Sequence, residues 1–402
     1  MNPELPLGRF ALVNGRVIAP GAVLHGKAVI IEGSAILDVA DAGSLGTELT
    51  TIDVGRRYIT PGLIDIHTHG AMGHSFNEPT VQAWATITEK NAACGVTSLL
   101  ATLATASIDA LVACLQFGRT WMSAPRGGAQ VIGVHLEGPY FSFEQRGAQN
   151  PKYLRTPDDG TADLLLEHTD VMRIMSFAPE LPGALDLVAR LVRSDVVAAA
   201  GHSSAKDSDV LAAMQVGLRH TIHIWSGQST TMREGPWRRP GLLQATLAFD
   251  GLTAEMISDN RHLPPTLMKL AYKCLGPDRL CAISDATSGA GLPEGTSFTL
   301  GGMACEIHNG VAMLLDRTSF AGSSTLLNQM VPILAQEVGI PLPEAIRMVS
   351  LTPARIIGAD HRKGSLRAGM DADIAVFEED FMPWRTMAGG RWIYSREDAQ
   401  RS

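Results

Sequence analysis

The stretch Pro61-Gly62-Leu63-Ile64-Asp65-Ile66-His67-Thr68-His69-Gly70 is an apolar run that ends in two histidines separated by one residue. In a β-strand, alternate side chains point to the same face, so His67 and His69 are expected to point together. Two imidazoles that converge at the end of a strand suit a divalent metal ion. Such a pair is common by chance, so its meaning depends on further ligands at the ends of other apolar strands.

Four other strand-like runs carry, at or near their ends, a side chain that can bind a metal or transfer a proton. In chain order these side chains are Glu137, His202, His223 and Asp285. Taken singly, each of them could be a hydrogen-bonded polar residue at the end of a strand. Five runs that all close on His, Glu or Asp are hard to explain as chance, and together they predict a metal centre.

The middle of the chain alternates strand and helix patterns. Helical patterns lie between the strands, as at Val81–Ala93 and Asp207–Val216. Eight strands alternating with helices predict an α/β fold, a (β/α)8 TIM-like barrel, whose active site lies at the carboxyl ends of its strands. The candidate ligands all fall at that end. The expected strands lie near residues 59–66, 97–103, 131–136, 171–177, 196–201, 220–225, 252–257 and 280–284.

Both ends of the chain have the pattern of short β-strands. Asn14-Gly15 lies between two apolar runs and is a hairpin signal, and similar runs recur after Lys363. We therefore expect residues 1–57 and 358–402 to form one small β-sandwich domain. Residues 58–357 are then the metal-dependent catalytic barrel inserted between them.

The composition is that of a globular protein, with 402 residues, 45% hydrophobic residues and a net charge of −8. The acidic balance argues against a nucleic-acid partner. The five cysteines include no CxxC pair and are expected to be reduced thiols. Met1–Leu5 has no signal-peptide pattern, and no apolar stretch approaches membrane-spanning length. A cytoplasmic protein without a membrane partner is expected.

Several longer motifs are specific to one family. The most telling are His135-Leu136-Glu137-Gly138-Pro139 and Ser284-Asp285-Ala286-Thr287. With the others, they resemble the amidohydrolase superfamily, and more closely the N-acetylglucosamine-6-phosphate deacetylase family, over nearly the whole chain. The other motifs are Asn150-Pro151, Ala178-Pro179-Glu180, Gly201-His202-Ser203, Arg239-Pro240-Gly241, Ala321-Gly322-Ser323-Ser324 and Thr352-Pro353-Ala354.

The resemblance implies that Glu137, His202 and His223 hold the main metal ion. Some members bind a second ion at the histidine pair of strand one, so His67 and His69 are expected to hold one here, with Glu137 as the bridge. Strand four lacks the lysine that bridges the metals in other amidohydrolases. One or two divalent ions per subunit are expected. Zinc is the first choice, and iron, manganese or cobalt are alternatives, because these ligands accept all four.

Asp285 is the expected catalytic residue. A bound metal can lower the pKa of its water from about 15.7 to about 7. Asp285, at the end of strand eight, is placed to accept the proton of that water and to give it to the leaving amine. The resemblance implies that N-acetylglucosamine-6-phosphate is converted to glucosamine-6-phosphate and acetate.

The resemblance also implies contacts to the substrate across a homodimer. Arg238 and His262 match the arginine and histidine that bind the phosphate from the neighbouring subunit, and the planar fork of an arginine suits a phosphate. His135 is given a supporting role near the metal or the sugar. His220 lies opposite His223 on its strand and is expected to be structural. The other expected substrate contacts are Ala148, Gln149, Ser226, Gly227 and Ala321.

Two positions depart from the family pattern. Ser226 stands where the family has an asparagine after the strand-six histidine, and Gln149 stands where it has a histidine. Both concern substrate recognition, so two alternatives stay open. One is an amidohydrolase that deacetylates a different or unphosphorylated N-acetylated sugar or an N-acyl-amino acid. The other is a non-catalytic relative kept as a scaffold, but a scaffold has no need of a proton shuttle such as Asp285.

Overall fold

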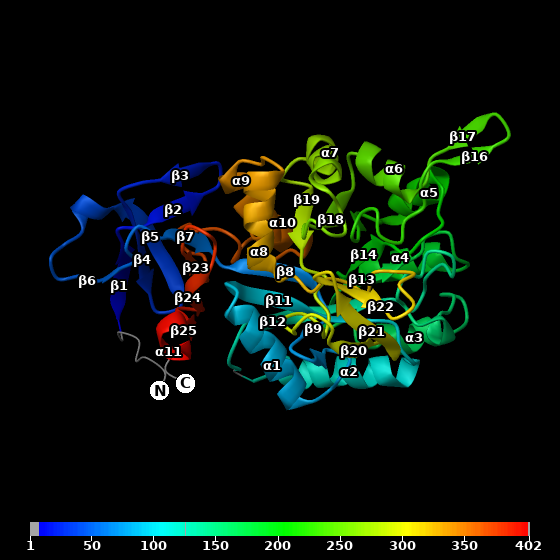
Figure 1. The fold of residues 1–402 in the computed structure, drawn as a ribbon, viewed down its shortest axis with the longest axis horizontal. Helices are drawn as coiled ribbons and strands as arrows, with labels where there is room; N and C mark the ends of the chain where they lie inside the picture. The colour runs from blue at the N-terminus through cyan, green and yellow to red at the C-terminus, as the bar shows by residue number, and fades with distance from the viewer. Residues whose placement is uncertain (1–7, 125, 401–402) are drawn as a thin grey trace.

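The computed structural model describes residues 8–124 and 126–400, so Met1–Leu5 lies outside the described part of the chain. Eight parallel strands form one sheet, and β19 also contacts β8, so the sheet curls into a nearly closed barrel (Figure 1). The predicted α/β fold with a TIM-like barrel is confirmed. In spatial order the strands are β8 (Leu63–Thr68), β11 (Val96–Leu103), β12 (Gln130–Glu137), β13 (Met172–Phe177), β14 (Val197–Ala200), β15 (His220–Thr221), β18 (Thr253–Ile257) and β19 (Leu280–Ile283).

Helices alternate with the strands and cover the outside of the barrel (Figure 1). The two helices predicted from the sequence are present as α1 (Val81–Ala92) and α5 (Asp207–Val216). α1 begins where Thr80 Oγ1 accepts the Ala83 N–H at 3.2 Å, which satisfies a free donor at the helix start. The others are α2 (Ile108–Met122), α3 (Thr161–Leu166), α4 (Ala184–Arg193), α6 (Leu242–Ala248), α7 (Pro265–Leu275), α8 (Leu327–Pro332), α9 (Leu342–Met348) and α10 (Leu351–Ile356). The short helix α11 (Arg396–Ala399) lies against the C-terminal strands and not on the barrel (Figure 1).

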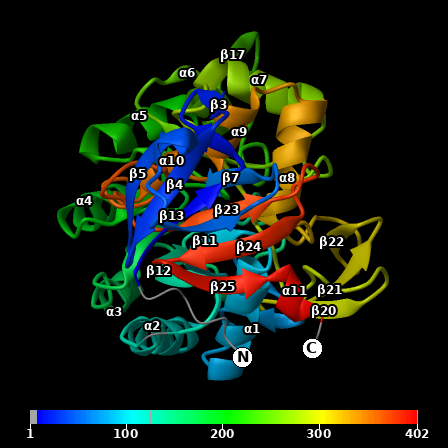
Figure 2. The ribbon, with the colours of Figure 1, turned by 90° about the vertical axis from the view of Figure 1, so that its left-hand side faces the viewer.

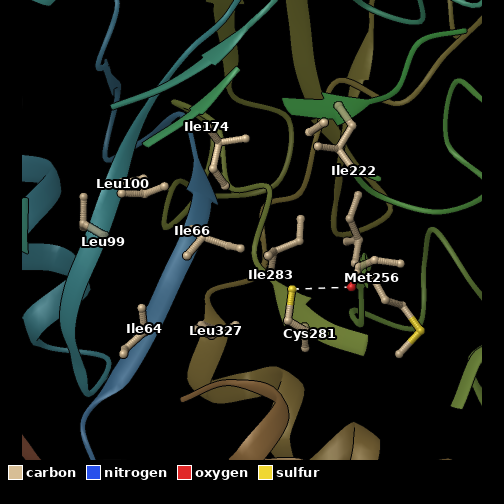
Figure 3. Packing of buried hydrophobic residues seen from close by; sticks show 14 of the residues in the cluster. Ile64, Ile66, Leu99, Leu100, Ile174, Ile222, Met256, Cys281, Ile283 and Leu327 are labelled. Carbon is tan, nitrogen blue, oxygen red and sulfur yellow. Dashed lines mark hydrogen bonds between the residues drawn. The ribbon is translucent and has the colours of Figure 1, made fainter. Parts of the chain in front are cut away.

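The barrel strands are buried on both faces. All eight residues of β11 are buried, which explains why the strands appear in the sequence as continuous apolar runs instead of alternating patterns. Figure 3 shows part of this core, where aliphatic side chains from several strands pack together and Cys281 Sγ lies 3.5 Å from the Ala254 carbonyl oxygen. Polar side chains are concentrated at the carboxyl ends of the same strands. Labelled core residues include Ile64, Ile66, Leu99, Ile174, Ile222, Met256 and Ile283.

The two ends of the chain build two further sheets that pack against each other around Phe10, Ile59 and Val376. In Figure 2 the N-terminal strands and the C-terminal strands lie side by side. The boundaries expected at residues 57 and 358 stay predictions. One sheet contains β5 (Ala35–Asp41), β4 (Lys27–Glu32), β1 (Arg9–Val13) and β6 (Thr50–Asp53), and the other contains β25 (Arg391–Ser395), β24 (Pro383–Ala388), β23 (Ile374–Phe377), β7 (Tyr58–Pro61), β2 (Arg16–Ala19) and β3 (Ala22–Leu24).

Two local predictions about these sheets were wrong. Asn14-Gly15 does not close a hairpin, because β1 and β2 belong to different sheets and the turn carries the chain from one to the other. The single strand expected near 59–66 is two strands, β7 in the terminal sheet and β8 in the barrel. They are separated at Gly62, where an added Cβ would lie 2.2 Å from Thr97 Oγ1. A side chain has no room at this crossing, so only glycine fits without displacement.

A three-stranded sheet follows the last barrel strand and was not predicted. It comprises β20 (Ser297–Leu300), β21 (Met303–His308) and β22 (Val311–Leu314), and Leu300 lines the cavity described below. Among residues 8–124 and 126–400, every helix is too short or too polar to span a bilayer.

Candidate metal centre and active site

Three of the predicted ligands meet at the carboxyl end of the barrel. Glu137, the last residue of β12, places Oε1 3.1 Å from His202 Nε2 and 3.0 Å from His223 Nε2. All three residues are buried, with at most 7% of their surface exposed. We call Glu137, His202 and His223 the main site.

A second group adjoins the main site. The Nε2 atoms of His67 and His69 lie 3.5 and 3.3 Å from Asp285 Oδ1. His69 Nε2 is also 3.4 Å from Glu137 Oε2, the oxygen that the main site leaves free. We call His67, His69 and Asp285 the second site. Glu137 therefore lies between the two sites: its Oε1 faces the main site and is also 3.7 Å from His67 Nε2, and its Oε2 faces His69.

Backbone and carboxylate oxygens fix the orientation of three of the imidazoles. His202 Nδ1 donates to the Gln145 carbonyl at 2.8 Å, and His223 Nδ1 donates to the Ser226 carbonyl at 3.1 Å. His67 Nδ1 lies 2.7 Å from Glu255 Oε2. With the proton on Nδ1, each ring presents the lone pair of Nε2 to the centre, as metal-binding histidines do.

The donor set fits a divalent cation. His67 Nε2 is buried and has no hydrogen-bond partner within the described residues. A buried nitrogen without a partner costs free energy unless something binds it. The surrounding atoms are imidazole nitrogens and carboxylate oxygens, which suit zinc and similar ions.

The electrostatic balance of the centre also favours a cation. Burial alone would raise the pKa of Glu137, but His202, His223 and His69 hold it well below its ordinary value. Burial likewise opposes ionisation of Asp285, and its histidine neighbours lower its pKa. Both carboxylates are therefore ionised near neutral pH, and their negative charge faces the Nε2 atoms.

The backbone is strained at three of these residues. His202, His223 and Asp285 have φ values of 43°, 21° and 47°, in the region that L-residues rarely adopt. Each such residue costs about 1–3 kcal/mol and persists only where the surroundings impose it. The strain turns the chain sharply at the strand ends, where the side chains must point into the centre.

A cavity of about 270 Å³ opens above the two sites and reaches Glu137, His202, His223, His69 and Asp285. Five of the predicted substrate contacts line it: Ala148, Gln149, Ser226, Gly227 and His262. Gln149 Oε1 accepts the Thr105 N–H at 3.0 Å, and its Nε2 donates to Glu137 Oε2 at 2.5 Å. Gln149 therefore holds the shared carboxylate as well as lining the cavity. Trp225 and Phe320, which sequence reasoning missed, complete the rim with Leu300.

The position of His262 corrects one expectation. His262 lines the cavity of its own chain, so a neighbouring subunit is not needed to supply it. Asp259 holds it there, because Oδ1 accepts the His262 N–H at 2.9 Å and Oδ2 lies 2.8 Å from His262 Nδ1. This local turn after β18 fixes the ring beside Phe320, at a ring-centroid distance of 4.7 Å.

Three other predicted residues do not line the cavity. Arg238 is exposed on β17 (Trp237–Arg239), which pairs with β16 (Met232–Glu234) in a hairpin that projects from the barrel (Figure 1). Ala321 is fully buried next to the rim. His135 is also fully buried, with Nε2 2.6 Å from Ser176 Oγ. His135 therefore lies outside the cavity wall, and its expected supporting role stays a prediction.

Sequence reasoning also missed Glu255, in the middle of β18. Its Oε2 lies 2.7 Å from His67 Nδ1, and its Oε1 lies 3.2 Å from His220 Nε2. Burial alone would lower the pKa of His67, but Glu255, Asp285 and Glu137 raise it to about 10, so a metal ion that binds Nε2 would displace a proton from it. A lone carboxylate within the apolar run Leu252–Ile257 was the signal that could have identified this residue.

We predict that Gly227→Ala weakens the main site. An added Cβ would lie 2.6 Å from His202 Nδ1 and 2.9 Å from the Gln145 carbonyl oxygen, the donor and the acceptor of the hydrogen bond that orients His202. The variant is expected to lose metal affinity and about 1–3 kcal/mol of unfolding free energy. Metal content after dialysis and thermal unfolding measure both effects.

Gly235→Ala is the matched control for this variant. Gly235 has the same φ of 58°, but nothing lies within 4 Å of the added Cβ. It therefore carries the cost of the backbone conformation without the clash, and its metal content should equal that of the wild type. Equal metal loss in both variants, or in neither, would contradict the assigned role of Gly227.

Comparison with known proteins agrees with this geometry. Residues 58–393 match the model of the amidohydrolase family. The chain belongs to the amidohydrolase family. The amidohydrolase superfamily is metal-dependent, and the clusters of His, Glu and Asp described above could hold metal ions.

Relatives named as deacetylases are similar over most of their length. The N-acetylglucosamine-6-phosphate deacetylase of Haemophilus influenzae is 32% identical over 386 residues, which is 96% of this chain and 99% of the relative. The N-acetylgalactosamine-6-phosphate deacetylase of Escherichia coli O157:H7 is 32% identical over 350 residues, or 85% of this chain and 90% of the relative. The predicted resemblance of the amidohydrolase to the deacetylase family is confirmed.

Solved structures of such deacetylases superpose closely on the amidohydrolase. That of the N-acetylglucosamine-6-phosphate deacetylase of Pasteurella multocida has a TM-score of 0.89 at 28% identity and covers 96% of this chain and 99% of that one. A mutant of the Mycobacterium smegmatis enzyme in complex with N-acetyl-D-glucosamine-6-phosphate has a TM-score of 0.88 at 28% identity, with coverage of 96% and 100%.

Proposed function

We propose that this amidohydrolase removes the acetyl group of N-acetylglucosamine-6-phosphate and releases glucosamine-6-phosphate and acetate. The observation that carries the proposal is the convergence of Glu137, three histidines and Asp285 at the floor of one cavity, with the buried His67 next to Asp285. The names of its full-length relatives supply the substrate class. His262 lies on the cavity wall, where an imidazole can donate a hydrogen bond to a phosphate oxygen.

The metal complement is part of the proposal. Glu137, His202 and His223 would hold one divalent ion, and His67, His69 and Asp285 would hold a second, with Glu137 shared. Zinc is the preferred ion, and iron, manganese and cobalt suit the same ligands. When bound, the ion supplies Lewis-acid activation of water and of the amide carbonyl.

Asp285 performs the proton transfers in the proposed reaction. Its carboxylate accepts a proton from the attacking water while the water oxygen bonds to the acetyl carbon. The carboxylic acid then returns that proton to the sugar nitrogen as the carbon–nitrogen bond breaks, so the products are a free amine and acetic acid, which keeps the second proton of the water and ionises to acetate at neutral pH. The hydrogen bond from Gln149 keeps the Glu137 carboxylate fixed during these steps.

The quaternary state and the cellular location are also part of the proposal. Arg238 is exposed on a projecting hairpin, so it could bind the substrate phosphate only in the cavity of another subunit, and we propose a homodimer on that basis. A cytoplasmic location suits the phosphorylated sugar and the free cysteines, Cys94, Cys114, Cys274, Cys281 and Cys305.

Acetate release from three substrates tests the proposal. We expect the metal-loaded enzyme to prefer N-acetylglucosamine-6-phosphate over N-acetylglucosamine by at least about 10-fold in kcat/KM, because one hydrogen bond to a charged group contributes about 1.5–3 kcal/mol. N-acetylgalactosamine-6-phosphate is the third substrate, since Ser226 departs from the family pattern and one relative carries that name. Turnover of neither phosphorylated sugar would overturn the proposal.

His262→Ala shows whether the phosphate accounts for the preference. The variant should raise KM for the phosphorylated sugar and leave turnover of the unphosphorylated sugar unchanged. Arg261→Ala is the control, because Arg261 is an exposed neighbouring cation outside the cavity wall. An equal loss on both sugars would exclude a phosphate contact for His262.

A further inference from the structure

Glu255 links three strands inside the barrel. It is fully buried in β18, and its two carboxylate oxygens point to different imidazoles. Oε2 lies 2.7 Å from His67 Nδ1 on β8, and Oε1 lies 3.2 Å from His220 Nε2 on β15. His220 is in turn held by Thr253, whose Oγ1 is 2.8 Å from His220 Nδ1. Every member of this chain of hydrogen bonds lies below the cavity.

The distance between Glu255 and His67 is that of a hydrogen bond. With metal–ligand bonds of about 2.0–2.1 Å, two ligands of one tetrahedral ion are about 3.3 Å apart. The 2.7 Å between His67 Nδ1 and Glu255 Oε2 is too short for that arrangement. A metal ion between His67, His135 and Glu255, whose donor atoms are also close together, is therefore disfavoured.

The opposite edge of the His67 ring has the spacing of a metal site. His67 Nε2 is 3.5 Å from Asp285 Oδ1 and 3.7 Å from Glu137 Oε1, and His69 Nε2 is 3.3 Å from the same Asp285 oxygen. These distances are close to the separation of about 3.3 Å between two ligand atoms of one tetrahedral ion. Because Nδ1 is committed to Glu255, the unpartnered Nε2 is the atom left to bind an ion.

We propose that Glu255, braced by His220, is the positioning residue that makes His67 a ligand of a second metal ion. The carboxylate holds the proton on His67 Nδ1 and fixes the plane of the ring, so that Nε2 faces Asp285 and His69. This inference rests on the proposed metal centre and assigns His220 a task within it. A carboxylate or carbonyl behind a metal-binding histidine is the usual means of fixing its tautomer.

Metal titration of the metal-free full-length protein tests the inference. Wild type is expected to bind two equivalents of Zn²⁺, one at each site. Glu255→Leu should weaken the second equivalent by about 10- to 100-fold, the usual cost of losing a partner behind a ligand. It should retain the first, because the contact of Glu255 with the main site is a long hydrogen bond of 3.4 Å from the His223 N–H. Glu255→Gln keeps an oxygen for His67 Nδ1 and should show a smaller loss, which also provides a measurement if the leucine variant does not fold.

Asp65→Asn is the matched control. Asp65 is equally buried, but its Oδ1 accepts the backbone N–H groups of His67 and Ser284 at 3.3 Å and contacts no imidazole. The Asp65→Asn variant should still bind two equivalents of Zn²⁺. A purely structural role of Glu255 would lower the unfolding temperature of the metal-free protein without a selective loss of the second ion.

The remaining outcomes are equally decisive. A single equivalent in wild type, a second equivalent unchanged in Glu255→Leu, or its loss in Asp65→Asn as well would each overturn the inference. Anomalous diffraction from zinc-loaded crystals locates the ions, and an ion found between Glu255 and His135 would also overturn it. None of these readings depends on the sugar, so failure here leaves the proposed deacetylation to be judged by acetate release alone.

Discussion

Asp285→Asn is expected to lower kcat by about 10²- to 10⁴-fold, the usual contribution of a general acid–base group, while the ion at the main site stays bound. Asparagine keeps the shape of the side chain but cannot accept a proton from water or give one to the amine. The main site contains no atom of Asp285, because its ligands are Glu137, His202 and His223. Single-turnover acetate release and metal analysis of the same sample measure the two effects.

The control for this variant is Asp316→Asn. Asp316 is exposed on the chain after β22 and accepts hydrogen bonds from Thr318 alone among the described residues. It should retain full activity. If Asp285→Asn were as active as Asp316→Asn with its metal in place, another group would have to transfer the proton.

Glu137→Gln is expected to abolish stabilisation by metal as well as activity. Glu137 is the one ligand whose oxygens face both sites, so a neutral amide there weakens the binding of either ion. A ligand at 1,000 times its Kd stabilises the folded state by about 4 kcal/mol, so added Zn²⁺ should raise the unfolding temperature of wild type. The variant should show little of that rise. Thermal unfolding with and without a chelator gives the comparison.

Glu180→Gln separates this effect from the loss of any buried carboxylate. Glu180 follows β13 and accepts hydrogen bonds from Ser203 Oγ and the Ser204 N–H at 2.7 and 2.6 Å, outside both metal sites. Burial raises the pKa of its carboxyl group, so a neutral replacement is tolerated there. If Zn²⁺ raised the unfolding temperature of Glu137→Gln as much as that of Glu180→Gln, Glu137 would not be a metal ligand.

The barrel and the ligand set were predictable for the same reason. Strands buried on both faces leave continuous apolar runs in the sequence, and the carboxyl ends of parallel strands meet at one end of a barrel. His67, Glu137, His202, His223 and Asp285 each end such a run or lie at its edge, and the structure brings them together.

The errors arose where a residue's partner is distant in the sequence. Asn14-Gly15 has the local form of a hairpin, but the pairing of β1 with β4 and of β2 with β7 decides the sheets. In the sequence, Glu255 is a single charged residue in an apolar strand. In the structure, β8 and β15 place His67 and His220 next to its carboxylate. Such partners are set by the closure of the barrel, and no local pattern records them.

The crossing at Gly62 connects the strand that ends in the histidine pair to the sheet built from both termini. β7 pairs with β23 immediately before this crossing, and the Gly62 N–H donates to the Asp373 carbonyl at 2.9 Å. β23 in turn pairs with β24, so residues near the end of the chain fix the position at which the first barrel strand begins. Shortening the C-terminus of this enzyme or fusing a protein to it is therefore expected to disturb the start of β8, although the change is made far from β8 in the sequence.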